Sequence, residues 1–252
     1  MSIGNGNASR IYVTSDAGAT WTLGFQNEDE LAFYDCMAFE SRLVGLALSD
    51  PVEGKFRLIK TVDGGTNWAL VDPAGMPTAL TSEFAFAASG TCLTSSPGGK
   101  YYTASGGVDP GRVFRSSDDG ETWNVTDTPV AGGQSAGVYS VVSQEAEHGI
   151  AVGGDYLVPN GTMGNAAWSK DGGVTWQAST VFPSGYRSGA AWRPGRCDIA
   201  IAVGPSGSDI TRDGGKTWMN FDNGSYDTIE CPTNDVCWAS GEKGRIARLT
   251  FD

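Results

Sequence analysis

The sequence predicts an all-β fold in which a unit of four short antiparallel strands is repeated along the chain. Three observations predict this fold. An eight-residue pattern ending in tryptophan occurs five times, about 40 to 55 residues apart. Glycine accounts for 36 of the 252 residues and charged residues for only 18%, which favours tight turns over long charged helices. Short runs rich in β-branched and aromatic residues precede each copy of the pattern.

The repeated pattern reads Ser/Thr-x-Asp-x-Gly-x-Thr-Trp, and only the second copy departs from it, with Asn67 in the Thr place. An aspartate two residues before a glycine predicts a tight turn, because the carboxylate accepts backbone N–H groups and glycine adopts a positive φ. The tryptophan then opens the next strand and buries a large ring. We call these segments the box turns; they span residues 14–21, 61–68, 116–123, 169–176 and 211–218. Their aspartates and tryptophans, to which we assign a structural role, are Asp16, Asp63, Asp118, Asp171, Asp213, Trp21, Trp68, Trp123, Trp176 and Trp218.

Each box turn is expected to join the third and fourth strands of one unit. The third strands are the runs Arg10–Val13, Phe56–Ile59, Arg112–Arg115, Ala166–Trp168 and Asp209–Ile210. The first and second strands are clearest in two units, at Tyr34–Phe39 with Val44–Ser49 and at Val138–Val142 with Gly149–Gly153. Repeated four-stranded units of this length are the blades of a β-propeller.

The units at the two ends of the chain are incomplete. The last box turn is followed by three strand-like runs, Tyr226–Cys231, Val236–Ser240 and Gly244–Leu249, without a further box turn or fourth strand. The N-terminal unit lacks its first strand and most of its second. We therefore expect about six blade units, four complete and two partial, in a single domain over residues 1–252. The pattern suggests an N-terminally shortened form of a parent with about seven blades; a six-bladed ring with an incomplete first blade is the alternative.

Charge and composition exclude several classes of function. The net charge of −12 opposes binding to nucleic acid and to anionic membrane surfaces. No apolar run approaches the roughly 18 residues of a transmembrane helix, and residues 1–7 lack the basic and apolar regions of a signal peptide. His148 is the only histidine and no Cys-x-x-Cys occurs, so no metal and no cofactor is expected.

The chain has five cysteines, two of which are close in sequence. Cys231 and Cys237 flank the segment Pro-Thr-Asn-Asp-Val. If this segment is a hairpin turn, the two thiols come within disulfide reach. A disulfide would imply an oxidising compartment; two small core residues are the alternative.

The box turns resemble the Asp-box, or BNR repeat, of sialidase-like and sortilin-like propellers. Five further strings, Leu48–Gly54, Val152–Tyr156, Tyr186–Gly189, Ala202–Pro205 and Trp238–Gly244, together resemble bacterial photosystem II stability/assembly factor-like proteins. This resemblance implies a non-catalytic scaffold that binds a partner protein and is secreted or periplasmic. Some relatives carry the label oxidoreductase, but the chain has no G-x-G-x-x-G between a strand and a helix and no closely spaced redox cysteines.

Two other classes of function stay open at this stage. A sialidase-like or other glycoside hydrolase would place two carboxylates in one cleft; acids are plentiful, although the F-R-I-P-type motif of sialidases is missing. A secreted carbohydrate-binding or adhesive propeller is the third class. The expected partner is therefore a protein, a polar small molecule or a glycan, and the chain is expected to be a monomer.

Blade geometry predicts where a ligand would bind. The start of strand one and the loop between strands two and three lie at the end of each blade opposite the box turn, and strand one lines the central channel. Aromatic and charged residues recur at these two places, as a polar ligand would require. The predicted channel-mouth site consists of Tyr34, Asp35, Asp50, Asp155, Tyr186, Arg187, Tyr226, Asp227, Glu242 and Lys243. Arg187 is expected to pair with a carboxylate; the alternative is that these charges only cap strand ends beside water.

Overall fold

The computed structural model describes residues 1, 3–88 and 90–251, and they form an all-β propeller of six sheets. We number the sheets as blades in chain order. Blade 1 contains β1 (Arg10–Val13) and β2 (Thr22–Gln26), and blade 2 contains β3 (Tyr34–Phe39), β4 (Gly45–Val52), β5 (Lys55–Thr61) and β6 (Ala69–Leu70). Blade 3 contains β7 (Leu93–Ser96), β8 (Lys100–Ala104), β9 (Arg112–Ser116) and β10 (Asn124–Asp127).

The remaining blades repeat this arrangement. Blade 4 contains β11 (Ala136–Gln144), β12 (His148–Asp155), β13 (Ala166–Ser169) and β14 (Gln177–Ala178). Blade 5 contains β15 (Gly189–Trp192), β16 (Ala200–Gly204), β17 (Gly207–Thr211) and β18 (Met219–Asp222), and blade 6 contains β19 (Thr228–Thr233), β20 (Val236–Gly241) and β21 (Arg245–Thr250). Three short 3-10 turns are η1 (Gly6–Ala8), η2 (Pro73–Gly75) and η3 (Glu242–Gly244). The predicted division into four complete and two partial units agrees with these sheets.

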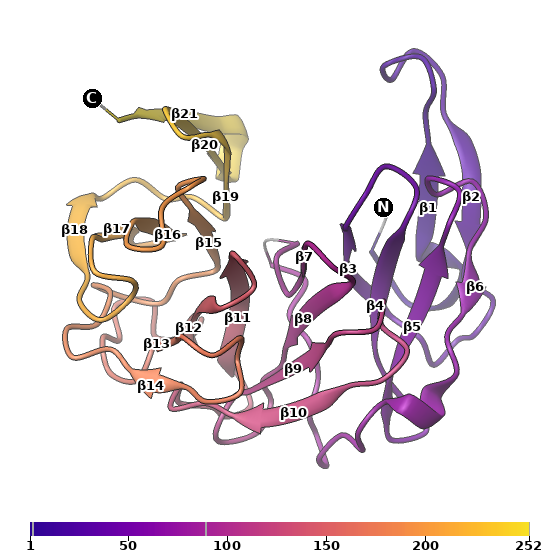
Figure 1. Ribbon diagram of the computed structural model, residues 1–252, viewed down its shortest axis with the longest axis horizontal. Helices are drawn as coiled ribbons and strands as arrows, with labels where there is room; N and C mark the ends of the chain where they lie inside the picture. The colour runs from indigo at the N-terminus through magenta and orange to yellow at the C-terminus, as the bar shows by residue number, and fades with distance from the viewer. Residues whose placement is uncertain (2, 89, 252) are drawn as a thin grey trace.

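Within every blade the strands pair antiparallel in chain order, with the first strand of blades 2 to 6 on the inside of the arc (Figure 1). Two of these inner strands begin with a bulge. The register shifts between Tyr34 and Cys36 in β3 and between Val138 and Ser140 in β11. The residues within the shifts are Asp35 and Tyr139. A bulge turns a side chain out of the regular alternation between the two faces of a strand. The side chains of Asp35 and Tyr139 therefore do not follow the alternation of the residues around them.

The box turns share one hydrogen-bond arrangement, which segment 169–176 illustrates. The Ser169 hydroxyl donates to the Asp171 carboxylate at 2.8 Å and accepts the Gly173 N–H at 2.9 Å. The Thr175 N–H and hydroxyl donate to the two Asp171 oxygens at 2.9 and 2.6 Å. Gly173 has a φ of 77°, which side chains larger than hydrogen disfavour. The aspartate thus closes the turn.

The apolar core lies between successive blades. Trp123 belongs to the buried cluster that includes Leu46 and Leu48 of blade 2, and Trp218 to the cluster that includes Ile150 and Val152 of blade 4. The box-turn tryptophan of one blade therefore packs on the blade before it. Trp68 and Trp176 occupy the corresponding places in two further clusters.

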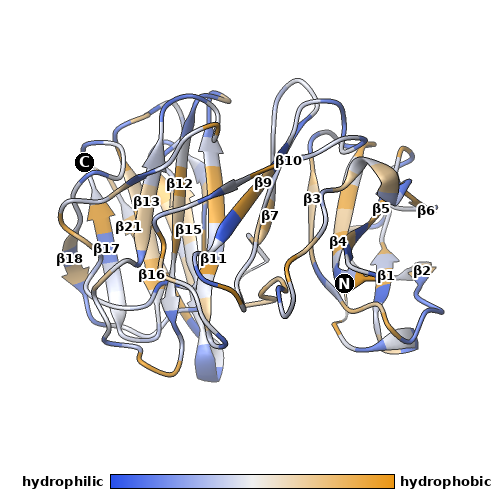
Figure 2. Cartoon of the chain, turned by 90° about the horizontal axis from the view of Figure 1, so that it is seen from below, coloured by the Kyte–Doolittle hydropathy of each residue, from blue (hydrophilic) through white to orange (hydrophobic). Residues whose placement is uncertain are grey.

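Within the part of the chain that the structure describes, the arc does not close through strand pairing. In the sheet order β21 has only β20 as a neighbour, and β1 has only β2. Figures 1 and 2 show blade 1 and blade 6 at opposite ends of the molecule. Trp21 of blade 1, for which the described residues form no preceding blade, is 61% exposed.

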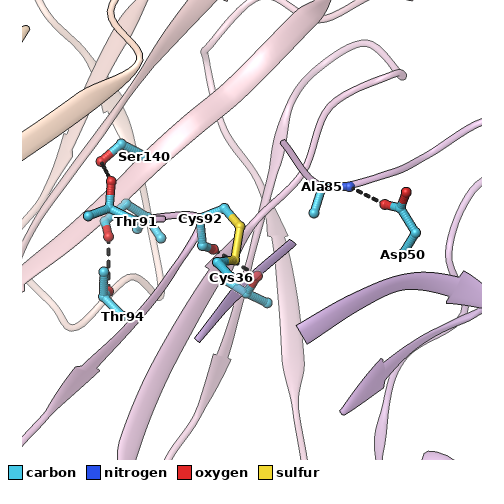
Figure 3. The surroundings of a disulfide bond; sticks show 9 residues. Cys36, Asp50, Ala85, Thr91, Cys92, Thr94 and Ser140 are labelled. Carbon is cyan, nitrogen blue, oxygen red and sulfur yellow. Dashed lines mark hydrogen bonds between the residues drawn. A yellow bond between two sulfur atoms is a disulfide. The ribbon is translucent and has the colours of Figure 1, made fainter. Parts of the chain in front are cut away.

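Two disulfides link the strands. Cys231 and Cys237 bond across the hairpin of β19 and β20, which is the first of the two alternatives for this pair. Cys36 of β3 bonds to Cys92, the residue before β7, and this pairing was not anticipated from the sequence. It joins the innermost strands of blades 2 and 3 (Figure 3). Among the described residues, no helix is long and apolar enough to span a membrane.

Candidate functional site

The predicted site residues lie at the starts of inner strands, in the loops just before these strands, at the ends of second strands or in the loops that follow the second strands. Because the strands alternate in direction, these places share the end of the blades opposite the box turns. We call this end the loop face. The residues are not gathered into one cluster. They form small groups, each within one blade or between two neighbours.

Asp35 and Asp50 form an acidic pair on the loop face of blade 2. Asp35 is 2% exposed, and one of its carboxylate oxygens is buried without a hydrogen-bond partner in the described part of the chain. Asp50 is half-buried and accepts the Ala85 N–H at 2.8 Å (Figure 3). Ala85 belongs to the segment that leads into blade 3. The pair therefore sits where two blades meet.

The environment of this pair disfavours the ionised form of both carboxyl groups and so raises their pKa values. Burial raises the pKa of Asp50 to about 6. Burial, and then the charge of Asp50, raise the pKa of Asp35 to about 8. Two carboxylates that share a site titrate together, because the charge of one disfavours the charge of the other. At neutral pH the pair is partly protonated.

Aromatic rings fill the loop face where blades 3, 4 and 5 meet. Phe86 stacks on Tyr139 with ring centroids 3.6 Å apart, and Tyr139 meets Tyr186 edge to face at 4.6 Å. All three rings are buried. Tyr186 therefore belongs to a closed aromatic cluster and does not face an open channel mouth. Tyr34 is also buried, but it meets Phe25 of blade 1 at 5.4 Å instead.

Arg187 pairs with a carboxylate, and the partner is Asp209 of β17. The Arg187 Nη2 lies 2.5 Å from the Asp209 carboxylate, and both side chains are almost completely buried. The Arg187 guanidinium also donates to the Tyr186 carbonyl and to the hydroxyls of Ser184 and Ser206. All of these contacts are internal to blade 5 and its leading loop. Arg187 therefore holds that loop and has no guanidinium surface free for a ligand.

The other predicted residues lie nearer to solvent. Asp155 is half-buried and caps the Leu157 N–H at 2.9 Å. Tyr226 is half-buried beneath the guanidinium of Arg245, whose Cζ lies 5.8 Å from the ring centroid. Three exposed residues complete the set: Asp227, Glu242 and Lys243. Glu242 and Lys243 approach each other at 3.7 Å in η3.

Two ion pairs on the loop face were not anticipated from the sequence. Arg112 of β9 pairs with buried Glu83, which also accepts the Ser105 hydroxyl at 2.5 Å. Arg57 of β5 pairs with Asp29. In each case the third strand is tied to the loop that leads into the first strand. Arg57 and Arg112 both stand four residues before a box turn, and this repeated spacing is the signal that could have identified them.

A cavity of about 590 Å³ runs along the central channel. Its walls come from the inner strands of blades 2 to 6, with the C-terminal ends of β3 and β11 and the N-terminal parts of β7 and β19 among them. Polar side chains such as Thr94, Ser143 and Gln144 line much of it. Glu230 of β19, whose side chain is exposed, also lines the cavity, and partial desolvation there raises its pKa. Among the described residues, no group of three or more His, Cys, Asp or Glu side chains is arranged to hold a metal ion.

No protein-family model and no curated protein sequence matches the chain, whereas several solved structures are similar to it. An ancestral GH74 enzyme superposes with a TM-score of 0.60 and 17% identity, over 96% of this chain and 34% of that one. A protein of unknown function from Dyadobacter fermentans gives a TM-score of 0.58 and 15% identity, over 97% and 83%. YCF48 from Cyanidioschyzon merolae gives 0.51 and 13%, over 88% and 67%.

The chain thus spans about a third of the length of the GH74 enzyme. At identities of 13 to 17%, a likeness of this kind carries information on architecture, because one fold hosts many unrelated functions. The shared architecture and the repeated four-stranded sheets lead to one conclusion: this chain has the β-propeller fold.

Proposed function

We propose that this chain is a non-catalytic interaction propeller that binds a positively charged group of a partner at the Asp35–Asp50 pair on the loop face. The observation that carries the proposal is the carboxylate oxygen of Asp35, which is buried without a partner beside a second, more accessible carboxylate. A buried carboxyl oxygen without a hydrogen-bond partner is costly, and a lysine or arginine side chain that reaches the Asp35–Asp50 pair would offset that cost. The resemblance to assembly factor-like scaffolds supports a protein as the partner.

The raised pKa values give this proposal a pH dependence. A cation is attracted only by ionised carboxyls, and the pKa of the two carboxyls is raised to about 6 and about 8. Binding should therefore be weak at pH 5 and tighten as the pH rises to 8. A bound cation also favours the ionised form, so binding should release protons near neutral pH.

The test is a titration of the chain with an acetylated tetralysine peptide by calorimetry at pH 5 and pH 8 in low salt. Asp50→Asn should weaken binding at pH 8 by about tenfold and flatten the pH profile. Asp127→Asn is the matched control, because it removes one exposed carboxylate of β10 and the same unit of charge. Equal weakening by the two variants would mean that only the net charge attracts the peptide, and would overturn the proposal.

One observation favours glycoside hydrolysis as a second candidate. A carboxyl that stays protonated at neutral pH beside a more acidic one is the arrangement of a general acid with its partner, and Asp35 and Asp50 have this order of pKa values. A panel of fluorogenic glycosides decides between the two candidates. We expect no release of fluorophore; release that Asp35→Asn abolishes would replace the scaffold by an enzyme.

A further inference from the structure

At two junctions between blades, a cation of one blade has a partner on the other at the box-turn end. The two residues involved are the one just before the box turn of the earlier blade and the sixth residue of the next box turn. At the junction of blades 2 and 3, the Lys60 Nζ lies 2.8 Å from a Glu121 carboxylate oxygen. At the junction of blades 4 and 5, the Lys216 Nζ lies 5.2 Å from the centroid of the Trp168 ring. The same two positions are therefore paired at both junctions.

The junction of blades 3 and 4, between these two, holds a cation without such a partner. Its two positions are Arg115 and Val174, and both residues line a cavity of about 430 Å³. Arg115 is half-buried, and its Nε is buried without a hydrogen-bond partner in the described part of the chain. A buried donor of a charged group that stays unpaired is costly. An acceptor is therefore missing at the place that Glu121 occupies beside Lys60.

Two further cations line the same cavity, although the protein as a whole has a net charge of −12. They are Lys100 at the start of β8 and Lys170 of the next box turn, and neither forms an ion pair with another described residue. Two acids also line the cavity. Asp171 uses both of its oxygens within its own box turn. Glu147 is exposed, and its charge contributes to the raised pKa of the Cys197 thiol. The cavity is therefore a local excess of positive charge.

We propose that the cavity between blades 3 and 4 binds a small phosphate monoester, whose oxyanion accepts hydrogen bonds from Arg115. A guanidinium donates two parallel hydrogen bonds to a phosphate group, and the charges of Lys100 and Lys170 favour a dianion. The cavity volume is typical of small-molecule sites, which span about 300–1,000 Å³, and Tyr102 and Val174 provide apolar surface for an organic group. The site lies at the box-turn end and is separate from the acidic pair on the loop face.

The probe is phenyl phosphate, which joins a dianion to a flat apolar group. Calorimetric titration of the full chain at pH 8 in low salt should give saturable binding at one site. Phenyl sulfate has the same shape and one negative charge fewer, so it should bind at least about tenfold more weakly. Inorganic phosphate distinguishes a free ion from an ester, and it should also bind more weakly because it lacks the ring. Equal or tighter binding of either compound would overturn the assignment to a phosphate monoester.

A variant that supplies the missing carboxylate tests the comparison between the junctions. Val174→Glu places an acid at the sixth box-turn position, as Glu121 is placed beside Lys60, and it should weaken the binding of phenyl phosphate by at least about tenfold. Val62→Glu is the matched control. It adds the same charge at a valine of the blade 2 box turn that is 66% exposed and absent from the cavity lining, so it should bind as the wild type does.

Removal of the cations tests the site from the other side. Arg115→Gln should weaken binding by at least about tenfold, and Lys170→Gln should weaken it to a smaller extent. Arg212→Gln is the control for Lys170→Gln, because Arg212 is the exposed second residue of the blade 5 box turn and is absent from the cavity lining.

Thermal melts report whether each variant is folded. If Arg115→Gln is not folded, Val174→Glu decides alone, because Val174 is 47% exposed and tolerates a polar side chain. Wild-type binding by a folded Val174→Glu variant would place the ligand elsewhere. Equal weakening by Lys170→Gln and Arg212→Gln would mean that only the net charge attracts the anion. Either result would overturn the proposal.

Discussion

Because the pKa of Asp35 is raised to about 8, this carboxyl group lowers the stability of the fold near neutral pH. Burial keeps the carboxyl protonated up to a pH of about 8, whereas in the unfolded chain it ionises near pH 4. Its contribution to stability is therefore full below pH 4 and is lost as the pH rises toward 8. A residue retained under such a penalty is typical of functional sites.

Replacement of Asp35 by Asn tests whether the ionised carboxyl group lowers stability. Asp35→Asn removes the charge at nearly constant shape, so it should raise the free energy of unfolding at pH 8, by up to about 5 kcal/mol for a pKa difference of about 4 units. At pH 4 the variant and the wild type should be equally stable. Urea unfolding at the two pH values measures the difference, and a loss of stability at pH 8 would mean that the ionised carboxylate is stabilised by a group we have not identified.

For the Arg187–Asp209 pair we expect the opposite effect, a loss of stability when one charge is removed. Arg187→Ala leaves the Asp209 carboxylate buried and uncompensated, and should cost about 3–5 kcal/mol of stability. Arg196→Ala is the control, since Arg196 and Asp198 form a pair of similar length at the surface, and it should unfold close to the wild type. If Arg187→Ala does not fold, the double variant Arg187→Met/Asp209→Leu should recover stability, because it removes both charges together.

At the scale of the elements, the tryptophans of the box turns differ in how much of the ring is covered, from 61% exposed for Trp21 to 6% for Trp123. Trp123 lies within a cluster that includes residues of blade 2, while no blade formed by the described residues covers Trp21 in the same way. Trp123→Ala should therefore cost about 3–5 kcal/mol. Trp21→Ala should cost less than about 1 kcal/mol, because most of its ring is already in water. Chemical unfolding of the two variants side by side makes the comparison, and similar losses would show that the rings act through their own turns.

The blades could be predicted from the sequence because the same physical constraint recurs in each. An aspartate–glycine turn with a following tryptophan fixes the third and fourth strands, and the strands that the structure shows begin or end within three residues of the predicted runs, as at Tyr34–Phe39 and Arg245–Thr250. The bulges in β3 and β11 could not be predicted in this way. They depend on neighbouring blades, and they re-aim Asp35 and Tyr139.

Less of the candidate site than of the fold could be predicted from the sequence. Charged residues at strand ends were expected to face a channel mouth, but burial is decided by the segments that lead into neighbouring blades. Those segments bring Phe86 onto Tyr139 and Ser184 onto Arg187. The pairing of Cys36 with Cys92 was missed for the same reason, because two residues far apart in sequence meet only when adjacent inner strands pack.

At the scale of the whole molecule, the two disulfides differ in what they constrain. Cys36 and Cys92 are 56 residues apart and join two blades, whereas Cys231 and Cys237 are 6 residues apart in one hairpin. In the loop-entropy view the first contributes about 4 kcal/mol and the second about 2 kcal/mol. Cys36→Ser/Cys92→Ser should therefore lower the urea midpoint more than Cys231→Ser/Cys237→Ser does. The reverse order would indicate that blade 6 depends on its hairpin more than blades 2 and 3 depend on their link.

The arrangement of the blades in an arc also determines which strands undergo local opening most readily. Blades that touch only their neighbours behave as a one-dimensional array, in which an inner unit is coupled on two sides and a terminal unit on one. Amide hydrogen exchange should then be slowest in the middle, in β8 and β12, and fastest in β1, β2 and β21, where opening costs the least free energy. Fraying of this kind stays local. Each tip can open while the central blades keep their packing.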